Sequence, residues 1–345
     1  MSNTPWSPGT ATGIGSMPGR DPVETASVVV GELPDLPHLP ELPGRGLGAD
    51  IIGRTAALLV DLPVEVVPSG YRTASRPGHE HRTAVDLLRR DLDALEEAVE
   101  RSGAKPPVVK VQLAGPWTLT AGIELARGHR VLTDSGALRE FTESLGEGVA
   151  LHAAEVSRRV GAPVVVQFDE PSLPAVLAGS LRTASGYGNV PAVLEPDARD
   201  VLAQVISAAS AATSQPVIVH CCAPQPPVGL FRSAGADALA LDATLLSSIP
   251  ASLSDALGEA WDSGTTMLLG LVPSTDPSSP PSLASIAAPA LRLVDRLGFP
   301  RSILATQAIP TPTCGLAGAT TDWAKRALEL VRDVGKAFVE PPESW

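Results

Sequence analysis

The chain of 345 residues is short of two things that nucleic-acid-binding proteins need. Aromatic residues make up only 3%, and 26 Lys and Arg are outnumbered by 38 Asp and Glu, so the formal net charge is -12. Binding of nucleic acid uses clustered basic residues for the phosphates and aromatic planes for the bases. The composition therefore disfavours a nucleic-acid partner.

Long apolar runs and cysteines are also scarce. The longest apolar runs fall far short of the roughly 20 residues that a membrane span needs, and no basic start followed by an apolar stretch marks a secretory signal. We expect a cytoplasmic protein with no membrane partner. The 3 cysteines of a chain in that reducing compartment indicate metal binding or nucleophilic chemistry rather than disulfides.

Short apolar segments alternate with amphipathic stretches along the chain. Hydrophobic residues make up 44%, enough for a sizeable core, and such short apolar runs are typical of parallel strands that are buried on both faces. The segments with this character are Thr12 to Met17, Pro63 to Val67, Val108 to Leu113, Val164 to Phe168, Val217 to His220, Ala238 to Leu241, Met267 to Leu271 and Ile303 to Thr306. Apolar residues three and four apart predict helices over Thr83 to Ser102, Ala137 to Val160, Asp197 to Ala212, Ser252 to Ser263, Leu283 to Leu297 and Asp322 to Val339.

This alternation predicts the fold class. About eight strands separated by helices favour an α/β fold of the (β/α)8 TIM-barrel type, built by residues 1–345 as a single domain. A doubly wound open sheet is the alternative. The Pro-rich stretches Leu33 to Pro43 and Pro273 to Pro281 are predicted to be ordered loops over the barrel mouth.

The strongest functional signal is a set of soft ligands at predicted strand ends. His220 and Cys222 are two residues apart, so on an extended segment both side chains point the same way while Cys221 points the opposite way. Asp242 ends the next strand and could supply a carboxylate oxygen, and Cys314 could complete a tetrahedron. Thiolates with an imidazole select zinc. The alternative is that the cysteines are small core residues and His220 is a satisfied buried histidine.

The same residues belong to a series of motifs that resembles the C-terminal catalytic domain of cobalamin-independent methionine synthases. The motifs extend along nearly the whole chain: Gly13-Ile14-Gly15-Ser16-Met17-Pro18, Leu113-Ala114-Gly115-Pro116-Trp117-Thr118, Gln167-Phe168-Asp169-Glu170-Pro171, His220-Cys221-Cys222 and Cys314-Gly315-Leu316. That family has a barrel whose zinc is held by His, Cys, Glu and Cys. The resemblance implies a Zn²⁺ site made by His220, Cys222, Asp242 and Cys314, with Asp in place of the usual Glu.

The resemblance also implies the substrates. Homocysteine would bind with its carboxylate on Ile14, Gly15 and Ser16, and with its ammonium group on Asp169 and Glu41. The methyl donor would be methyltetrahydrofolate or a methylated corrinoid. Trp117 offers a stacking plane for that donor, although a packing role fits it equally well.

One departure from the family concerns proton transfer. The family carries a catalytic His after the strand that corresponds to Met267 to Leu271, whereas this chain reads Val272-Pro273-Ser274-Thr275-Asp276-Pro277. Asp276 is the candidate replacement. Two alternatives stay open beside a methyltransferase: a thiol-binding protein that keeps zinc without turnover, and an enzyme like uroporphyrinogen decarboxylase, which needs no metal but needs basic residues for its substrate carboxylates.

Overall fold

The computed structural model of the protein describes residues 4–342 and shows one curled sheet enclosed by helices. Six parallel strands pair in the order β3-β5-β6-β7-β8-β9. Their bounds are β3 (Val109–Ala114), β5 (Val164–Asp169), β6 (Val217–Cys221), β7 (Ala238–Asp242), β8 (Thr266–Val272) and β9 (Ala308–Pro312). Apart from the half-exposed last residue of β7, every residue of these strands is buried, as the apolar runs predicted.

Two extended segments close this sheet into a barrel. Thr12 donates its backbone N–H to the Pro310 carbonyl of β9, and Glu41 donates to the Gly15 carbonyl. Leu39 in turn donates to the Lys110 carbonyl of β3. The wall is therefore continuous, the predicted (β/α)8 barrel is confirmed, and an open doubly wound sheet is excluded.

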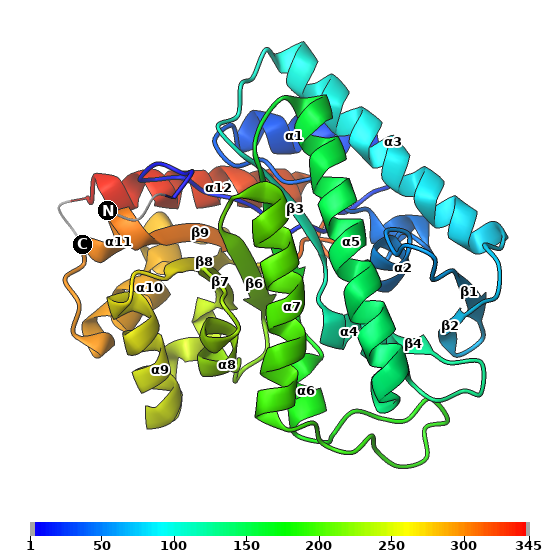
Figure 1. Ribbon diagram of the computed structural model, residues 1–345. Helices are drawn as coiled ribbons and strands as arrows, with labels where there is room; N and C mark the ends of the chain where they lie inside the picture. Colours follow the sequence, from blue (N-terminus) through cyan, green and yellow to red (C-terminus); the bar gives the residue numbers. More distant parts are fainter. Residues whose placement is uncertain (1–3, 343–345) are drawn as a thin grey trace.

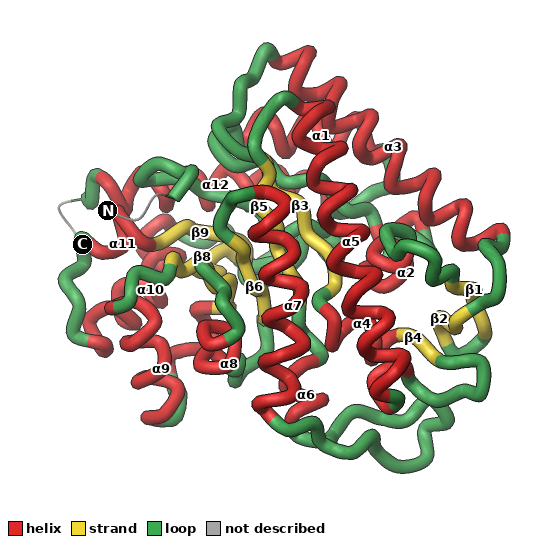
Figure 2. Tube along the Cα trace, in the orientation of Figure 1, coloured by secondary structure: helices red, strands yellow, loops and turns green. Residues whose placement is uncertain are grey.

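Helices cover the outside of the wall, and the wall strands occupy the centre (Figure 1; Figure 2). The twelve α-helices among the described residues are α1 (Pro22–Glu32), α2 (Ile51–Ala56), α3 (His79–Ser102), α4 (Pro116–Gly122), α5 (Ser135–Val160), α6 (Leu173–Leu177), α7 (Glu195–Thr213), α8 (Val228–Ser233), α9 (Ala251–Asp262), α10 (Leu283–Leu297), α11 (Ile303–Gln307) and α12 (Thr321–Val339). Three 3₁₀ turns accompany them: η1 (Pro43–Arg45), η2 (Val131–Thr133) and η3 (Ala243–Ser247). All six amphipathic stretches predicted from the sequence are helical.

Three sequence predictions about the wall were wrong in their details. The segment from Ile303 to Thr306 is helical, and the last wall strand is β9, whose two prolines disguise it. Pro63 to Val67 does contain a strand, β1 (Val64–Val67), but it pairs outside the barrel with β2 (Gly70–Thr73), which pairs with β4 (Ile123–Glu124). The second wall segment lies instead in the Pro-rich stretch that was predicted to be a loop. Prolines have no N–H to donate, but Leu39 and Glu41 stand between them and donate their own N–H groups to the neighbouring wall segments.

The core has two parts, one on each side of the wall. The larger cluster lies between the sheet and the helices and includes Cys221. The smaller one fills the barrel interior with residues from the wall strands and the N-terminal segments: Trp6, Ile14, Leu36, Val108, Val165, Ile218, Ala238, Ala240, Leu268 and Ile309. Since side chains alternate along a strand, the residues two and four positions further on also face inward and approach the mouth at the carboxyl ends of the strands.

Candidate metal centre

Two thiols and an imidazole converge at the barrel mouth. His220 belongs to β6, Cys222 follows that strand directly, and Cys314 follows β9. One ligand atom from each lies within 4.8 Å of the others, and the two sulfur atoms are 3.1 Å apart with both cysteines free. Strand geometry explains the selection, because Cys221 points to the opposite side and is packed in the outer core.

The ring of His220 is oriented by a carboxylate. Its Nδ1 lies 2.9 Å from Oδ1 of Asp169, which is its register partner on the neighbouring strand β5. Its Nε2 is buried and finds no hydrogen-bond partner within residues 4–342. A carboxylate on one ring nitrogen with the other nitrogen open is the usual arrangement of a metal-ligating histidine. The donor set therefore fits a soft divalent metal.

The two thiols of this cluster are shifted in opposite directions, and deprotonation is favoured at Cys314. Cys314 and Cys222 share a hydrogen bond between their sulfur atoms, and this bond lowers the pKa of Cys314, against the effect of burial and with help from His220. The same bond and burial raise the pKa of Cys222. Burial opposes a charge on His220, but Asp169 and Cys314 raise its pKa to about 9. A metal cation would replace the protons that these groups share.

Asp242 lies close to this group but outside it. Its Oδ1 accepts hydrogen bonds from the backbone N–H and the hydroxyl of Thr244, at 2.9 and 2.5 Å, and so begins η3. Burial raises the pKa of Asp242, and the Thr244 bonds oppose that shift. The structure thus brings together three residues that could hold a metal, and the role of Asp242 as a fourth ligand stays a prediction.

A cavity of about 310 Å³ opens beside the thiols. Besides His220, Cys222 and Cys314 it is lined by five residues predicted to bind substrate: Ile14, Gly15, Ser16, Glu41 and Asp169. The structure therefore brings together segments that lie up to 300 residues apart in the chain. Five further lining residues were given no role from the sequence: Pro43, Asp50, Ile51, Pro171 and Gly315. Pro171 and Gly315 stand in the motifs quoted above, and Asp50 directly precedes the short helix α2 that it caps.

Glycines allow the first segment to approach its neighbours. A Cβ on Gly15 would lie 2.6 Å from Cγ of Gln112, and one on Gly315 would collide with the Ser16 hydroxyl. Leu316 donates its N–H to the Ser16 carbonyl over 2.7 Å. The residues next to Cys314 therefore hold the Ile14 to Ser16 segment against the metal ligands.

Two acidic side chains of the cavity repel each other. Glu41 is buried, and Oε1 lies 3.8 Å from Nε of Arg54. Burial raises the pKa of Glu41 to about 7, Arg54 lowers it and Asp169 raises it further. A cationic ligand between Glu41 and Asp169 would relieve this cost.

The two remaining candidates lie away from the cavity. Trp117 is 1% exposed, and its Nε1 donates to the Ala198 carbonyl of α7 over 2.9 Å, so the structure gives it packing contacts. Asp276 binds the N–H and hydroxyl of Thr320 at 2.8 and 2.5 Å, at the start of α12. Neither residue lines the cavity among the residues described.

Comparison with known proteins agrees with this geometry. Residues 9–337 match the family model described as the catalytic domain of cobalamin-independent synthase. The chain belongs to this family. It is therefore a member of a metal-using methyltransferase family, as the sequence motifs indicated.

Solved structures of similar fold include two methyltransferase proteins. A B12-independent methionine synthase from Shewanella sp. W3-18-1, in complex with selenomethionine, has a TM-score of 0.61 and 10% identity over 97% of this chain and 98% of that one. A methyltransferase from Methanosarcina mazei has a TM-score of 0.53 and 16% identity over 99% and 94%. At these identities the likeness concerns the fold. A search of curated protein sequences finds no match.

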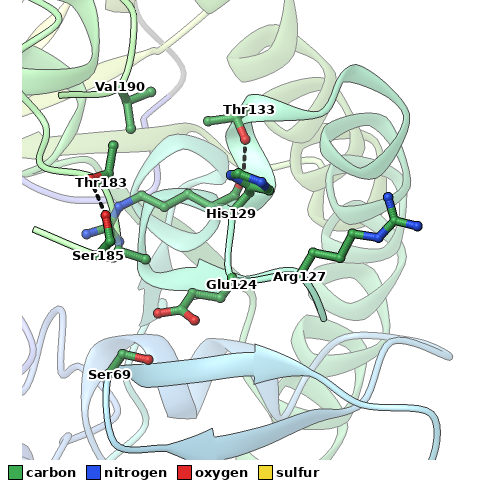
Figure 3. Close-up of a pocket in the computed structure, with 11 residues that line it drawn as sticks. Ser69, Glu124, Arg127, His129, Thr133, Thr183, Ser185 and Val190 are labelled. Atoms are coloured by element: carbon green, nitrogen blue, oxygen red, sulfur yellow. Dashed lines mark hydrogen bonds between the residues drawn. The ribbon is translucent and has the colours of Figure 1, made fainter. Parts of the chain in front are cut away.

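A second, larger cavity does not carry the chemistry of the family. It measures about 440 Å³ and lies between β4 and the loops around residues 127–130 and 183–190. Figure 3 shows Ser69, Glu124, His129 and Ser185 around it, and none of the described residues that line it is a cysteine. Arg130 on its wall donates hydrogen bonds to the carbonyls of Ala121 and Arg182.

Within residues 4–342 no helix is long and apolar enough to cross a membrane.

Proposed function

We propose that the protein is a zinc-dependent methyltransferase that moves a methyl group to the thiol of homocysteine and forms methionine. The observation that supports it best is the meeting of Cys222, Cys314 and the open Nε2 of His220 at the edge of a small acidic cavity. Asp242, at the end of the adjacent strand, is the proposed fourth ligand. A zinc ion held there would favour the thiolate form of an incoming thiol and hold its sulfur.

The cavity suits the rest of a small amino acid. Its described lining includes Glu41, Asp50 and Asp169 but no Lys or Arg. Asp50 is already engaged by the N–H groups of Ile52 and Gly53 and by Tyr71. Glu41 and Asp169 would take the ammonium group, and the backbone and hydroxyl of Ile14 to Ser16 would take the carboxylate. An acidic lining also argues against a decarboxylase for substrates with several carboxylates.

The reaction forms one bond and breaks another. The sulfur of the thiol attacks the methyl carbon of the donor, whose C–N bond in methyltetrahydrofolate or C–Co bond in a methylated corrinoid breaks. The donor keeps the electron pair: the nitrogen of the folate takes up a proton in place of the methyl group, so the thiol proton is balanced there, whereas a corrinoid leaves as Co(I) and the thiol proton goes to solvent. The residues of this chain bind and orient the thiol. Because two of them are reduced cysteines, we propose the cytoplasm as the compartment.

A second function follows from the position of Asp276. The family's catalytic His is missing after β8, and Asp276 is bound to Thr320 and lies outside the cavity. This favours, as the alternative, a protein that binds zinc and a thiol without turnover.

One experiment separates these functions. The purified protein is analysed for zinc, then incubated with homocysteine and each donor in turn: methyltetrahydrofolate, its triglutamate and a methylated corrinoid protein. We expect one zinc per chain and methionine by mass spectrometry, and neither with Cys222→Ser. Thiol binding without methionine from any donor would support the binding protein. Zinc below about a tenth of an equivalent after zinc-replete expression would contradict both functions.

A further inference from the structure

A row of buried polar side chains lies beneath the metal centre, inside the barrel. Lys110 is on β3 and Gln167 on β5, each two residues beyond an apolar residue of the inner core, Val108 and Val165. Both side chains are completely buried. A lysine in such a place costs free energy that an aliphatic residue would not, so its contacts need an explanation.

Hydrogen bonds join this row to the metal centre. Nζ of Lys110 donates to Oε1 of Gln167 over 2.7 Å. Nε2 of Gln167 donates to Oδ1 of Asp169 over 2.7 Å, and the same oxygen lies 2.9 Å from Nδ1 of His220. The chain of contacts thus runs from Lys110 through Gln167 and Asp169 to His220.

The direction of these bonds is fixed by chemistry. Nε2 of Gln167 faces two oxygens that accept, Oδ1 of Asp169 and the Ile14 carbonyl, so the NH₂ end of the amide lies there and its oxygen faces Lys110. Lys110 donates to that oxygen and so holds the Gln167 side chain in this orientation. The amide in turn donates to the same carboxylate oxygen of Asp169 that contacts His220.

The same two residues also hold the proposed substrate segment. The Ile14 carbonyl accepts from Lys110 over 2.8 Å and from Gln167 over 3.0 Å. Ile14 lines the cavity together with His220. One pair of side chains therefore contacts both the support of the imidazole and the backbone on which the amino acid would lie.

We propose that Lys110 and Gln167 are positioning residues that fix the imidazole of His220 and the Ile14 to Ser16 segment relative to each other. This inference rests on the proposed function, because it takes His220 as a metal ligand. Neither residue reaches the cavity, so they act through Asp169 and the Ile14 carbonyl. An outer residue that orients a ligating histidine typically changes metal affinity about 10- to 100-fold when it is replaced.

The test replaces Gln167 and uses Gln112 as the matched control. Gln112 is the register partner of Gln167 on β3, is also buried, and lies 3.4 Å from Lys110, but its Nε2 donates to the Leu39 carbonyl and not to Asp169. Zinc affinity is measured by competition with a chromogenic chelator. The visible spectrum of the cobalt(II)-substituted protein reports the geometry of the ligands. Neither measurement needs a methyl donor.

We expect Gln167→Leu and Lys110→Met to bind zinc about 10- to 100-fold more weakly and to shift the cobalt spectrum, whereas Gln112→Leu keeps both as in the wild type. Gln167→Glu is the near-isosteric variant, because its carboxylate can still accept from Lys110 but, when ionised, cannot donate to Asp169. It should also bind zinc more weakly, and its melting temperature, measured beside that of Gln167→Leu, shows that the protein assayed is folded.

Folded Gln167→Glu and Gln167→Leu proteins with wild-type zinc affinity and cobalt spectra would overturn the inference. The outcome is distinct from a failure of the proposed function. If the wild type binds zinc and the Gln167 variants bind it weakly, but no donor yields methionine, the positioning role stands and the methyltransferase does not. If methionine forms and the variants bind zinc normally, only the positioning role fails.

Discussion

Asp169 and Glu170 are consecutive carboxylates with opposite situations. Glu170 is completely buried, and its oxygens accept from the N–H groups of Trp117 and Thr118 and from the Thr118 hydroxyl, all within 2.9 Å. Asp169 faces the cavity and accepts from His220, whose second nitrogen meets no hydrogen-bond partner in the described part of the chain. We call Glu170 with Trp117 and Thr118 the complete cluster, because protein groups occupy both carboxylate oxygens. We call Asp169 with His220 and the neighbouring thiols the open cluster, because it faces the cavity.

The difference shows how a residue that stabilises the fold can be distinguished from a neighbouring residue that belongs to a binding site. Burial raises the pKa of Glu170 to about 7 although three hydrogen bonds lower it, so a perturbed pKa occurs in the complete cluster too. A buried polar atom at a cavity that lacks a hydrogen-bond partner is a better sign of a ligand site than a perturbed pKa. Glu170 therefore fixes α4 to the end of β5, whereas Asp169 contacts the imidazole of His220 at the candidate metal centre.

The largest effect should come from the open cluster itself. Cys314→Ser replaces a soft ligand by a hydroxyl, and we expect zinc affinity to fall on the order of a thousandfold, about 4 kcal/mol. Cys221→Ala is the matched control, since that thiol is packed in the outer core. Equal zinc content of the two proteins by metal analysis would contradict the proposed ligand set.

The complete cluster should affect stability instead. Glu170→Ala leaves two backbone N–H groups and one hydroxyl without partners, and we expect the free energy of unfolding to fall by roughly 3 kcal/mol. Urea unfolding monitored by tryptophan fluorescence measures this. Zinc affinity of the folded variant should stay near that of the wild type, and a large loss of it at full stability would reverse the two roles.

Asp169→Asn tests the other member of the pair. It keeps the shape but removes the charge that supports the imidazole, so zinc affinity should fall about 10- to 100-fold. The free energy of unfolding should change by less than it does in Glu170→Ala. Competition with a chelator and urea unfolding of both variants, side by side, give the comparison. A stability loss in Asp169→Asn as large as in Glu170→Ala would show that both carboxylates mainly stabilise the fold.

The smallest effect should come from Trp117, which belongs to the complete cluster. Trp117→Phe removes the bond from Nε1 to the Ala198 carbonyl, and we expect a loss of about 1 kcal/mol in the free energy of unfolding. Zinc affinity should not change. Loss of methyl transfer from a folate donor at unchanged stability would instead assign this ring to donor binding.

The sequence predicted the strands that are built from apolar runs, and it failed where prolines interrupt the pattern. β9 and the segment around Leu39 contain two or more prolines in or beside them, yet their free N–H and carbonyl groups still pair. In the site, the two-residue spacing predicted that His220 and Cys222 face the same way. Ile14, Gly15, Ser16 and Glu41 followed only from the family resemblance.

The supporting residues could not be found in this way. Asp169 contacts His220 because of the register in which β5 pairs with β6. The sequence of either strand alone does not determine that register. Lys110 and Gln167 stand in strands next to valines, where the alternation shows that they face inward but not which carbonyl or carboxylate they reach. Their identity as partners is a property of the closed barrel.

Closure of the barrel wall by both ends of the chain also determines when the site can assemble during synthesis. The pocket takes Ile14 from the first wall segment, His220 from the middle and Cys314 from beyond the last strand. A nascent chain emerging from the ribosome holds His220 and Cys222 long before Cys314 is made. The proposed metal centre can therefore assemble only after Cys314 has been made, and a product truncated before Cys314 would hold one of the two proposed thiolate ligands.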